Sequence, residues 1–200
     1  MSLISMLKSV ATTKAIGVLA IPAAVVVSGL LVWNGSTAAF SGTTTNDGNQ
    51  WTAGTISLKN DRATALFAST GITPGYSETH CITVTSTANV PTTLKMYTAN
   101  VTGTGSPTTL SQNLNIQVNK GSGSTDANCT GFTPAAGAAD YTGTLDAFAA
   151  TNNYANGVGA IPLPAGGAQQ YKITVSLPSG APNTLQGSTA AAKFIWEAQG

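Results

Sequence analysis

Residues 110–119 read LSQNLNIQVN and show the clearest alternation of apolar and polar residues in the chain. Successive side chains of a β-strand point to opposite faces, so this pattern predicts a strand with one buried and one solvated face. The buried face would carry Leu114, Ile116 and Val118, and the solvated face Asn113, Asn115, Gln117 and Asn119. Such half-buried strands are typical of antiparallel sheets.

Other runs with strand character predict the remaining strands. They are Trp51–Leu58, Ala63–Ala68, Tyr76–Thr85, Thr92–Thr102, Gln169–Leu177 and Ser188–Gln199. Gly143–Ala149 fits either a short strand or a helical turn, and Ala150–Gly167 is expected to be a connector. Because helix signals are few and turns separate the runs, we predict an all-β fold. The expected architecture is a two-sheet antiparallel sandwich of jelly-roll type, with Tyr171 and Trp196 in its core.

The N-terminal region has the layout of an export signal. Lys8 and Lys14 precede an apolar run over Ala15–Val32, and small residues follow at 37–39. This order predicts a hydrophobic signal helix over residues 1–39, with cleavage after Ala38 or Ala39 that leaves Ala39 or Phe40 first. The apolar run is also close to the length that spans a bilayer, so retention as a membrane anchor stays open.

The rest of the chain divides into a short leading segment and one domain. Residues 40–50 read FSGTTTNDGNQ, which is polar and turn-rich, and are predicted to be flexible. Residues 51–200 have no internal repeat or linker and suit a single domain with its own core.

The charge of the chain excludes one large class of functions. Charged residues make up only 8% of the sequence, where about a quarter is usual. Loss of Lys8 and Lys14 with the signal would leave six basic against seven acidic residues. Because no basic stripe exists, nucleic acid is not expected as a partner, and membrane contact is expected only through the signal segment.

The two cysteines, Cys81 and Cys129, predict one disulfide in an exported protein. A catalytic thiol or a metal ligand is the rival interpretation. Each of these needs a partner base or further ligands, and the chain has a single histidine.

Enzyme chemistry finds little support in the sequence, and no catalytic residue, metal site or cofactor is predicted. His80 and Glu78 would share a strand face as half of a metal site, but hydrolytic zinc needs about three protein ligands. Neither an HExxH nor a G-x-S-x-G pattern occurs. Exposed aromatic residues could instead mark a sugar-binding face; the candidates are Trp51, Tyr76, Tyr97, Tyr141 and Tyr154.

The junction after the signal resembles the start of proteins of the TasA/camelysin family, in an actinobacterial-like form. The resemblance is carried by AAF before Ser41, by the aromatic Trp51, and by the run AGTISL over residues 53–58. Looser matches are Pro74-Gly75 before a strand with Cys81, and the closing KFIWEAQ. The resemblance implies cleavage by a SipW-type signal peptidase and a jelly-roll subunit of biofilm-matrix fibres. The name camelysin also implies a metallopeptidase, which the residues above do not favour.

The expected function is therefore that of a secreted structural protein at the cell surface or in the extracellular matrix. In the fibres that the resemblance implies, the mature N-terminus pairs with the sheet of the next subunit, so the partner is the protein itself, head to tail. The predicted donor residues are Phe40, Ser41, Thr43, Thr45 and Trp51. A frayed N-terminus is the simpler interpretation of that segment. A monomeric module that binds wall or matrix polysaccharide remains the alternative function.

Overall fold

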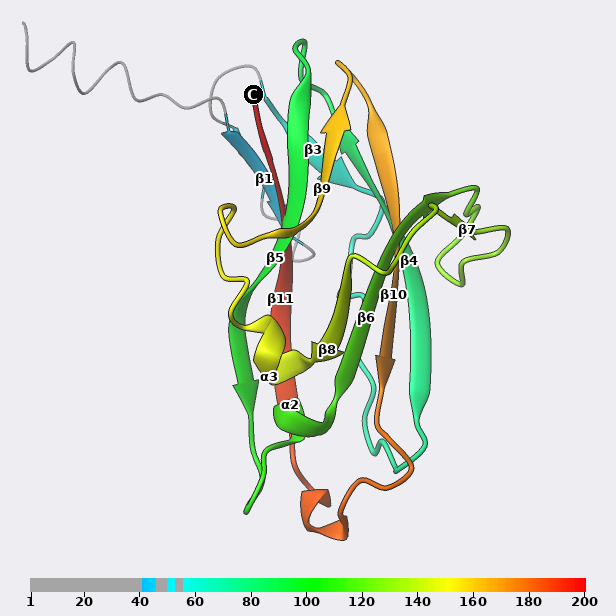
Figure 1. Ribbon diagram of the computed structural model, residues 1–200, viewed down its shortest axis with the longest axis vertical. Coiled ribbons are helices and arrows are strands. Elements are labelled where there is room, and N and C mark those ends of the chain that lie inside the picture. Colours follow the sequence, from blue (N-terminus) through cyan, green and yellow to red (C-terminus); the bar gives the residue numbers. More distant parts are fainter. Residues whose placement is uncertain (1–40, 46–49, 53–55) are drawn as a thin grey trace, which may run out of the picture. The chain divides into compact units, whose positions relative to one another are not determined.

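The computed structural model describes residues 41–45, 50–52 and 56–200, the first two ranges by their backbone only (Figure 1). Contacts between Cα atoms divide the chain into one unit of Met1–Ala39 and another of Phe40–Gly200. The predicted signal segment, with its cleavage residues Ala38, Ala39 and Phe40, lies outside the described residues.

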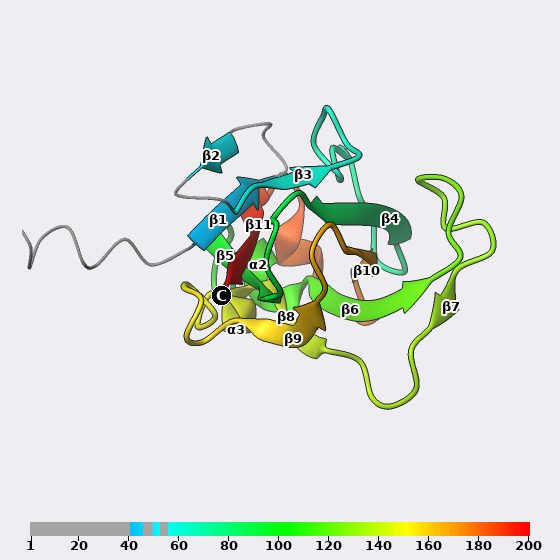
Figure 2. The same cartoon turned by 90° about the horizontal axis from the view of Figure 1, so that it is seen from above.

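The second unit is built almost entirely from antiparallel strands in two sheets. The first sheet has the order β2 (Gln50–Thr52), β1 (Ser41–Thr45), β11 (Ala190–Gln199), β5 (Thr92–Gly103) and β9 (Val158–Leu163). The second has the order β3 (Leu58–Asn60), β4 (Ser77–Ser86), β10 (Ala168–Ser176), β6 (Asn115–Ser122) and β7 (Thr133–Pro134), and β8 (Tyr141–Thr144) also pairs with β6. Seen from above, β1, β11 and β5 lie on one side and β4, β10 and β6 on the other (Figure 2). The predicted all-β, two-sheet class is confirmed.

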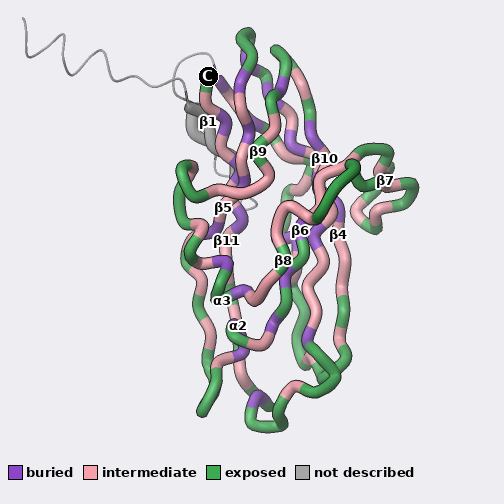
Figure 3. The backbone as a smooth tube through the Cα atoms, in the orientation of Figure 1, coloured by how far each residue is buried: buried purple, intermediate pink, exposed green. Residues whose placement is uncertain are grey.

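The core lies where the inward faces of the two sheets meet. Trp196 of β11 and Tyr171 of β10 are fully buried, and their ring centroids are 5.8 Å apart. Figure 3 shows buried positions recurring along the strands, while exposed residues gather in the loops. Both aromatic residues that the alternation placed in the core are found there.

The register of the strands defines two ends of the sandwich. β11 finishes at Gln199, opposite Ser41 of β1, and this end also holds the connection from β4 to β5. We call it the terminal end. At the other end β4 and β11 begin and β5 and β10 finish, since Gly103 pairs with Ala190 and Ser176 with Ser77.

Most predicted strands are present, and the ambiguous stretch 143–149 contains both of its expected forms. Tyr141–Thr144 is strand β8, and Leu145–Phe148 is the short helix α3. The Thr144 hydroxyl ends the strand and caps the helix, because it accepts a hydrogen bond from the Ala147 N–H at 3.1 Å.

Four predicted elements between residues 51 and 167 need correction. Trp51–Leu58 was predicted to be one strand, but β2 ends at Thr52, Ser57 is in no strand and β3 begins at Leu58. Ala63–Ala68 was predicted to be a strand but has no regular structure; Leu66 is buried there without a strand ladder. The alternation from residue 110 begins with the helical turn α2 (Leu110–Asn113), because Leu110 and Leu114 both face the core and Leu114 N–H donates to Leu110 O at 2.9 Å. The connector 150–167 contains β9, whose Pro162 is tolerated because β9 is an edge strand.

Candidate functional site

Strand β11 is bordered by strands of very different kinds. On one side it pairs with β5 from Ala190 to Gln199, with a bulge between Ala191 and Lys193. On the other side it pairs with β1, from Ser41 opposite Gln199 to Thr45 opposite Ile195. On this side of β11, β1 pairs with the second half of the strand, Ile195–Gln199. We call the backbone on this side of β11 the β11 edge.

The structure places three of the five predicted donor residues in β1, directly beside β11, and a fourth in β2, which pairs with the other side of β1. Ser41, Thr43 and Thr45 lie in β1, and Trp51 lies in β2, opposite Thr43. Phe40 lies outside the described residues. Part of the segment predicted to be flexible thus forms a strand paired within its own domain. Its sequence SGTTT suits a strand that pairs on both sides, with β11 and with β2, because three β-branched threonines favour extended backbone and no proline interrupts either ladder.

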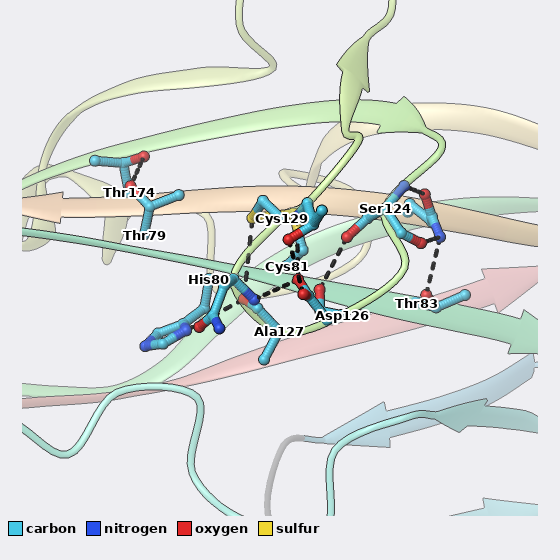
Figure 4. Close-up of a disulfide and its surroundings, with 12 residues drawn as sticks. Thr79, His80, Cys81, Thr83, Ser124, Asp126, Ala127, Cys129 and Thr174 are labelled. Carbon is cyan, nitrogen blue, oxygen red and sulfur yellow. Dashed lines mark hydrogen bonds between the residues drawn. A yellow bond between two sulfur atoms is a disulfide. The ribbon is translucent and has the colours of Figure 1, made fainter.

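The disulfide joins Cys81 of β4 to Cys129 in the loop between β6 and β7 (Figure 4). The two Cα atoms are 5.1 Å apart, within the usual range for a disulfide. Ala127 of the same loop accepts a hydrogen bond from the Cys81 N–H at 2.9 Å. The predicted pairing is present in the structure, and it fastens this loop to the outer side of the second sheet.

The loop is also held by a carboxylate. Asp126 accepts hydrogen bonds from the N–H groups of Thr130 (3.0 Å) and Asn128 (2.9 Å), and from the Thr130 hydroxyl (2.8 Å). The Thr130 bonds are the main reason that the pKa of Asp126 is lowered. These hydrogen bonds order the loop next to the disulfide. All three are donated to the Asp126 carboxylate by residues of the same loop.

Glu78 and His80 do form a pair on one face of β4. His80 Nε2 lies 2.8 Å from Glu78 Oε1, and His80 Nδ1 lies 3.3 Å from Ala127 O. The Ser69 hydroxyl donates to Glu78 Oε2 at 2.5 Å, and the Tyr76 hydroxyl also donates to that oxygen. The Ser69 bond, followed by the Tyr76 bond, lowers the pKa of Glu78 to about 2.

The polar groups of this cluster are hydrogen-bonded to one another. Both oxygens of the Glu78 carboxylate already accept hydrogen bonds from within the chain. Among residues 56–200, no group of three or more His, Cys, Asp or Glu side chains is placed to hold a metal ion. The i, i+2, i+4 spacing of Tyr76, Glu78 and His80 along a strand signals the cluster in the sequence, whereas Ser69 comes from a loop that no pattern links to it.

The aromatic candidates for a sugar-binding face lie in several places. The Tyr97 hydroxyl donates to Glu197 at 2.9 Å. Burial, followed by this hydrogen bond to a carboxylate, raises the pKa of Tyr97. Tyr154 donates to Thr93 O at 2.9 Å, and the Lys95 ammonium lies 4.9 Å from the centroid of its ring. Tyr141 is stacked on Phe148, with centroids 3.9 Å apart. Tyr76 belongs to the Glu78 cluster, and for Trp51 only the backbone is described.

A cavity of about 550 Å³ opens at the end of the sandwich opposite the terminal end, and we call this the cavity end. It is lined by the loop before β4, by α2 and by the loop before β11. Buried aliphatic side chains form its floor: Leu110, Leu114, Leu177 and Leu185. Phe67 and Tyr76 contribute to its wall. Sequence patterns did not indicate this cavity, because its walls come from loops that are distant along the chain.

No described helix has the length and apolar character needed to cross a membrane. In comparisons with known proteins, no family model and no curated protein matches this chain.

Proposed function

We propose that the protein is a secreted structural subunit that assembles into fibres at the cell surface or in a biofilm matrix. In this proposal the segment that forms β1 pairs with β11 of a neighbouring copy instead of its own. The observation that carries the proposal is the pairing of β1 with the β11 edge, over only five residues. The same segment of another copy could make the same backbone hydrogen bonds, so exchange costs little in bonding.

The order of the strands supports a jelly-roll type for the sandwich. Eight strands can be taken in chain order as β1, β4, β5, β6, β8, β9, β10 and β11. The first sheet then has the order first, eighth, third, sixth, and the second sheet the order second, seventh, fourth, fifth. Two Greek keys that form a jelly roll have this connectivity. In this scheme β1 is the first strand, and a domain that releases it needs a replacement at the β11 edge.

An exposed strand edge favours such a replacement. Without β1, the N–H and C=O groups on the outer side of Ile195–Gln199 would lose their partners. Pairing of one copy with the next through this edge is heterologous, so it continues into an open filament rather than closing into a dimer. The partner is the protein itself, after a SipW-type signal peptidase has removed the signal. The proposal needs no cofactor, no catalytic residue and no nucleic acid.

Electron microscopy of the signal-free protein, beginning at Phe40, tests the proposal. We expect filaments from this protein and none after deletion of residues 40–50. Circular dichroism of the shortened protein should still show a β-rich spectrum, because residues 56–200 keep β3 to β11 and all of the buried side chains that the structure describes. Filaments that persist after the deletion would contradict strand donation by this segment.

A monomeric module that binds wall or matrix polysaccharide is the second candidate. The cavity favours it, because aromatic and hydroxyl groups of Phe67, Tyr76 and Ser69 meet at its wall. Sedimentation of the protein with insoluble wall polysaccharide, in the absence of filaments, would select this function over the first.

A further inference from the structure

The cavity at the cavity end has an apolar and uncharged interior. Four buried leucines form its floor, and the described residues that line it include no Lys, Arg, His, Asp or Glu. The hydroxyl hydrogens of Ser69 and Tyr76, in its wall, are already used within the Glu78 cluster. A polar group that entered this interior would lose its hydrogen bonds to water without new ones, whereas an alkyl or aromatic group would gain from leaving water.

The walls of the cavity are fixed in place by hydrogen bonds. In the loop before β4, the Gly75 N–H donates to Leu177 O at 2.9 Å. In the loop before β11, a 3₁₀ turn spans Asn183–Leu185, and the Thr189 N–H donates to the Thr104 hydroxyl at 2.8 Å. The volume of about 550 Å³ between these loops lies within the range of roughly 300–1,000 Å³ that preformed small-molecule sites have.

Two side-chain amides stand at the rim of the cavity. Asn183 and Gln186 both line it and are exposed. Within the part of the chain that the structure describes, neither amide group makes a hydrogen bond to another residue. Because each amide carries both a donor and an acceptor, the pair can bind a hydroxyl, amide or ester group of a molecule whose apolar part lies deeper.

The charges around the cavity favour a neutral molecule. The described lining offers neither a cation that could pair with an acid nor an anion that could pair with an ammonium group. Glu78 lies behind the wall, where it accepts hydrogen bonds from Ser69 and Tyr76. These bonds lower the pKa of Glu78 to about 2, so it is ionised at neutral pH and disfavours a second negative charge nearby.

We propose that this cavity binds a small uncharged amphiphile, with its alkyl chain against the leucine floor and its polar group at the amides of Asn183 and Gln186. The binding site goes beyond the fibre function and does not depend on it. A saccharide fits the interior less well, because its hydroxyl groups would meet aliphatic side chains and lose hydrogen bonds.

Calorimetric titration with straight-chain alcohols tests the proposal. The protein that begins at Phe40 is suitable, because this compact unit contains the whole cavity. From hexan-1-ol to decan-1-ol, we expect one molecule bound per chain and a Kd that falls about fourfold for each added methylene, the effect of burying one CH₂ group. Decanoate has a charged head group on a similar chain and should bind roughly tenfold more weakly than decan-1-ol.

Variants locate the bound alcohol. Ala190 lines the cavity, while its neighbour Ala191 is exposed and lies outside the lining. Ala190→Trp should fill part of the cavity and weaken decan-1-ol binding at least about tenfold, through lost burial of the chain. Ala191→Trp is the matched control and should leave the Kd unchanged.

A second variant tests the rim without changing the interior. Asn183→Ala/Gln186→Ala should weaken each alcohol by about fivefold, through a lost hydrogen bond, and keep the same step per methylene. Both positions are exposed, so this variant keeps the core and tests the proposal even if Ala190→Trp does not fold. Melting temperatures check the fold of every variant.

The results that would overturn the proposal are separate from those that bear on fibres. Absence of alcohol binding, a Kd that does not depend on chain length, or equal binding by the two Trp variants would contradict the site. Decanoate that binds as tightly as decan-1-ol would contradict the neutral ligand. Binding of the N-acetylglucosamine hexamer that Ala190→Trp abolishes, without alcohol binding, would make the cavity a saccharide site instead. Absence of filaments would count against the fibre proposal alone.

Discussion

Strand β11 separates two neighbours that contribute differently to the molecule. β5 pairs with it along nearly all its length and contributes fully buried Leu94 and Met96 to the core. β1 pairs with it over five residues and consists of Ser, Gly and Thr. A strand that shares the core cannot leave without exposing apolar surface, whereas a short polar strand forms mainly backbone bonds that another copy could supply. Stability and assembly are therefore expected to depend on opposite sides of β11.

Removal of the disulfide should have the largest effect on stability and little effect on assembly. Cys81 and Cys129 are 48 residues apart, and the entropy of closing such a loop corresponds to about 4 kcal/mol. Urea unfolding of the Cys81→Ala/Cys129→Ala protein should show a loss of this order. Filaments formed at a temperature where the variant is folded would show that stability and assembly are separable. Their absence in folded protein would contradict that separation.

A substitution on the β5 side should come next. Leu94 is fully buried and lies opposite Ala198 of β11. Leu94→Ala should lower the free energy of unfolding by about 2–5 kcal/mol, through lost burial and a residual cavity. Lys95→Ala, on the outer side of the same strand, is the matched control and should cost far less. Equal losses for the two variants would show that the inner side of β5 does not support the core.

The β1 side of β11 can be tested by adding the β1 segment as a separate peptide. A peptide of residues 40–52 should bind a protein shortened to residues 51–200, because the β11 edge is then unpaired. A scrambled peptide of the same composition should not bind. Isothermal titration calorimetry gives the stoichiometry, which we expect to be one to one. Equal binding of both peptides would mean that register against β11 does not matter.

Acid should produce the smallest effect, through the Glu78 cluster. The pKa of Glu78 is lowered from 4.5 to about 2 in the folded protein, so its contribution to stability is present above pH 4.5. That contribution is lost as the pH falls toward 2. The melting temperature of Glu78→Gln should therefore vary less between pH 5 and pH 2 than that of the unmodified protein. Identical pH profiles would show that the hydrogen bonds from Ser69 and Tyr76 do not favour the ionised carboxylate.

The sequence predicted the parts of the fold that depend on local alternation. β4, β5, β10 and β11 follow their apolar patterns, and the buried positions Ile116 and Val118 fall where the period of two places them. β9 was not predicted, because Gly159 and Pro162 are residues typical of loops and β9 lacks a clear apolar alternation. The stretch with Leu66 was assigned wrongly because apolar residues can be buried without a strand ladder.

The candidate site was predictable only in part, for the same physical reason. The spacing of Glu78 and His80 along one strand indicated their contact, and two cysteines in a chain predicted to be exported indicated their bond. The cavity is formed by loops that are far apart in the sequence and close together in the fold, such as those with Ile72 and Leu185. A local sequence pattern does not predict which loops will lie close together.

Cross-linking of β1 to β11 tests the central claim most directly. Thr43 lies opposite Glu197, so Thr43→Cys and Glu197→Cys together place two thiols in register. In filaments of this protein we predict disulfides between subunits, seen as a ladder of covalent oligomers on a non-reducing gel. Thr44→Cys with Glu197→Cys, one residue out of register, should give little ladder. Filaments of the in-register protein that dissolve only into monomers, with the two introduced thiols bonded to each other inside one chain, would contradict strand exchange.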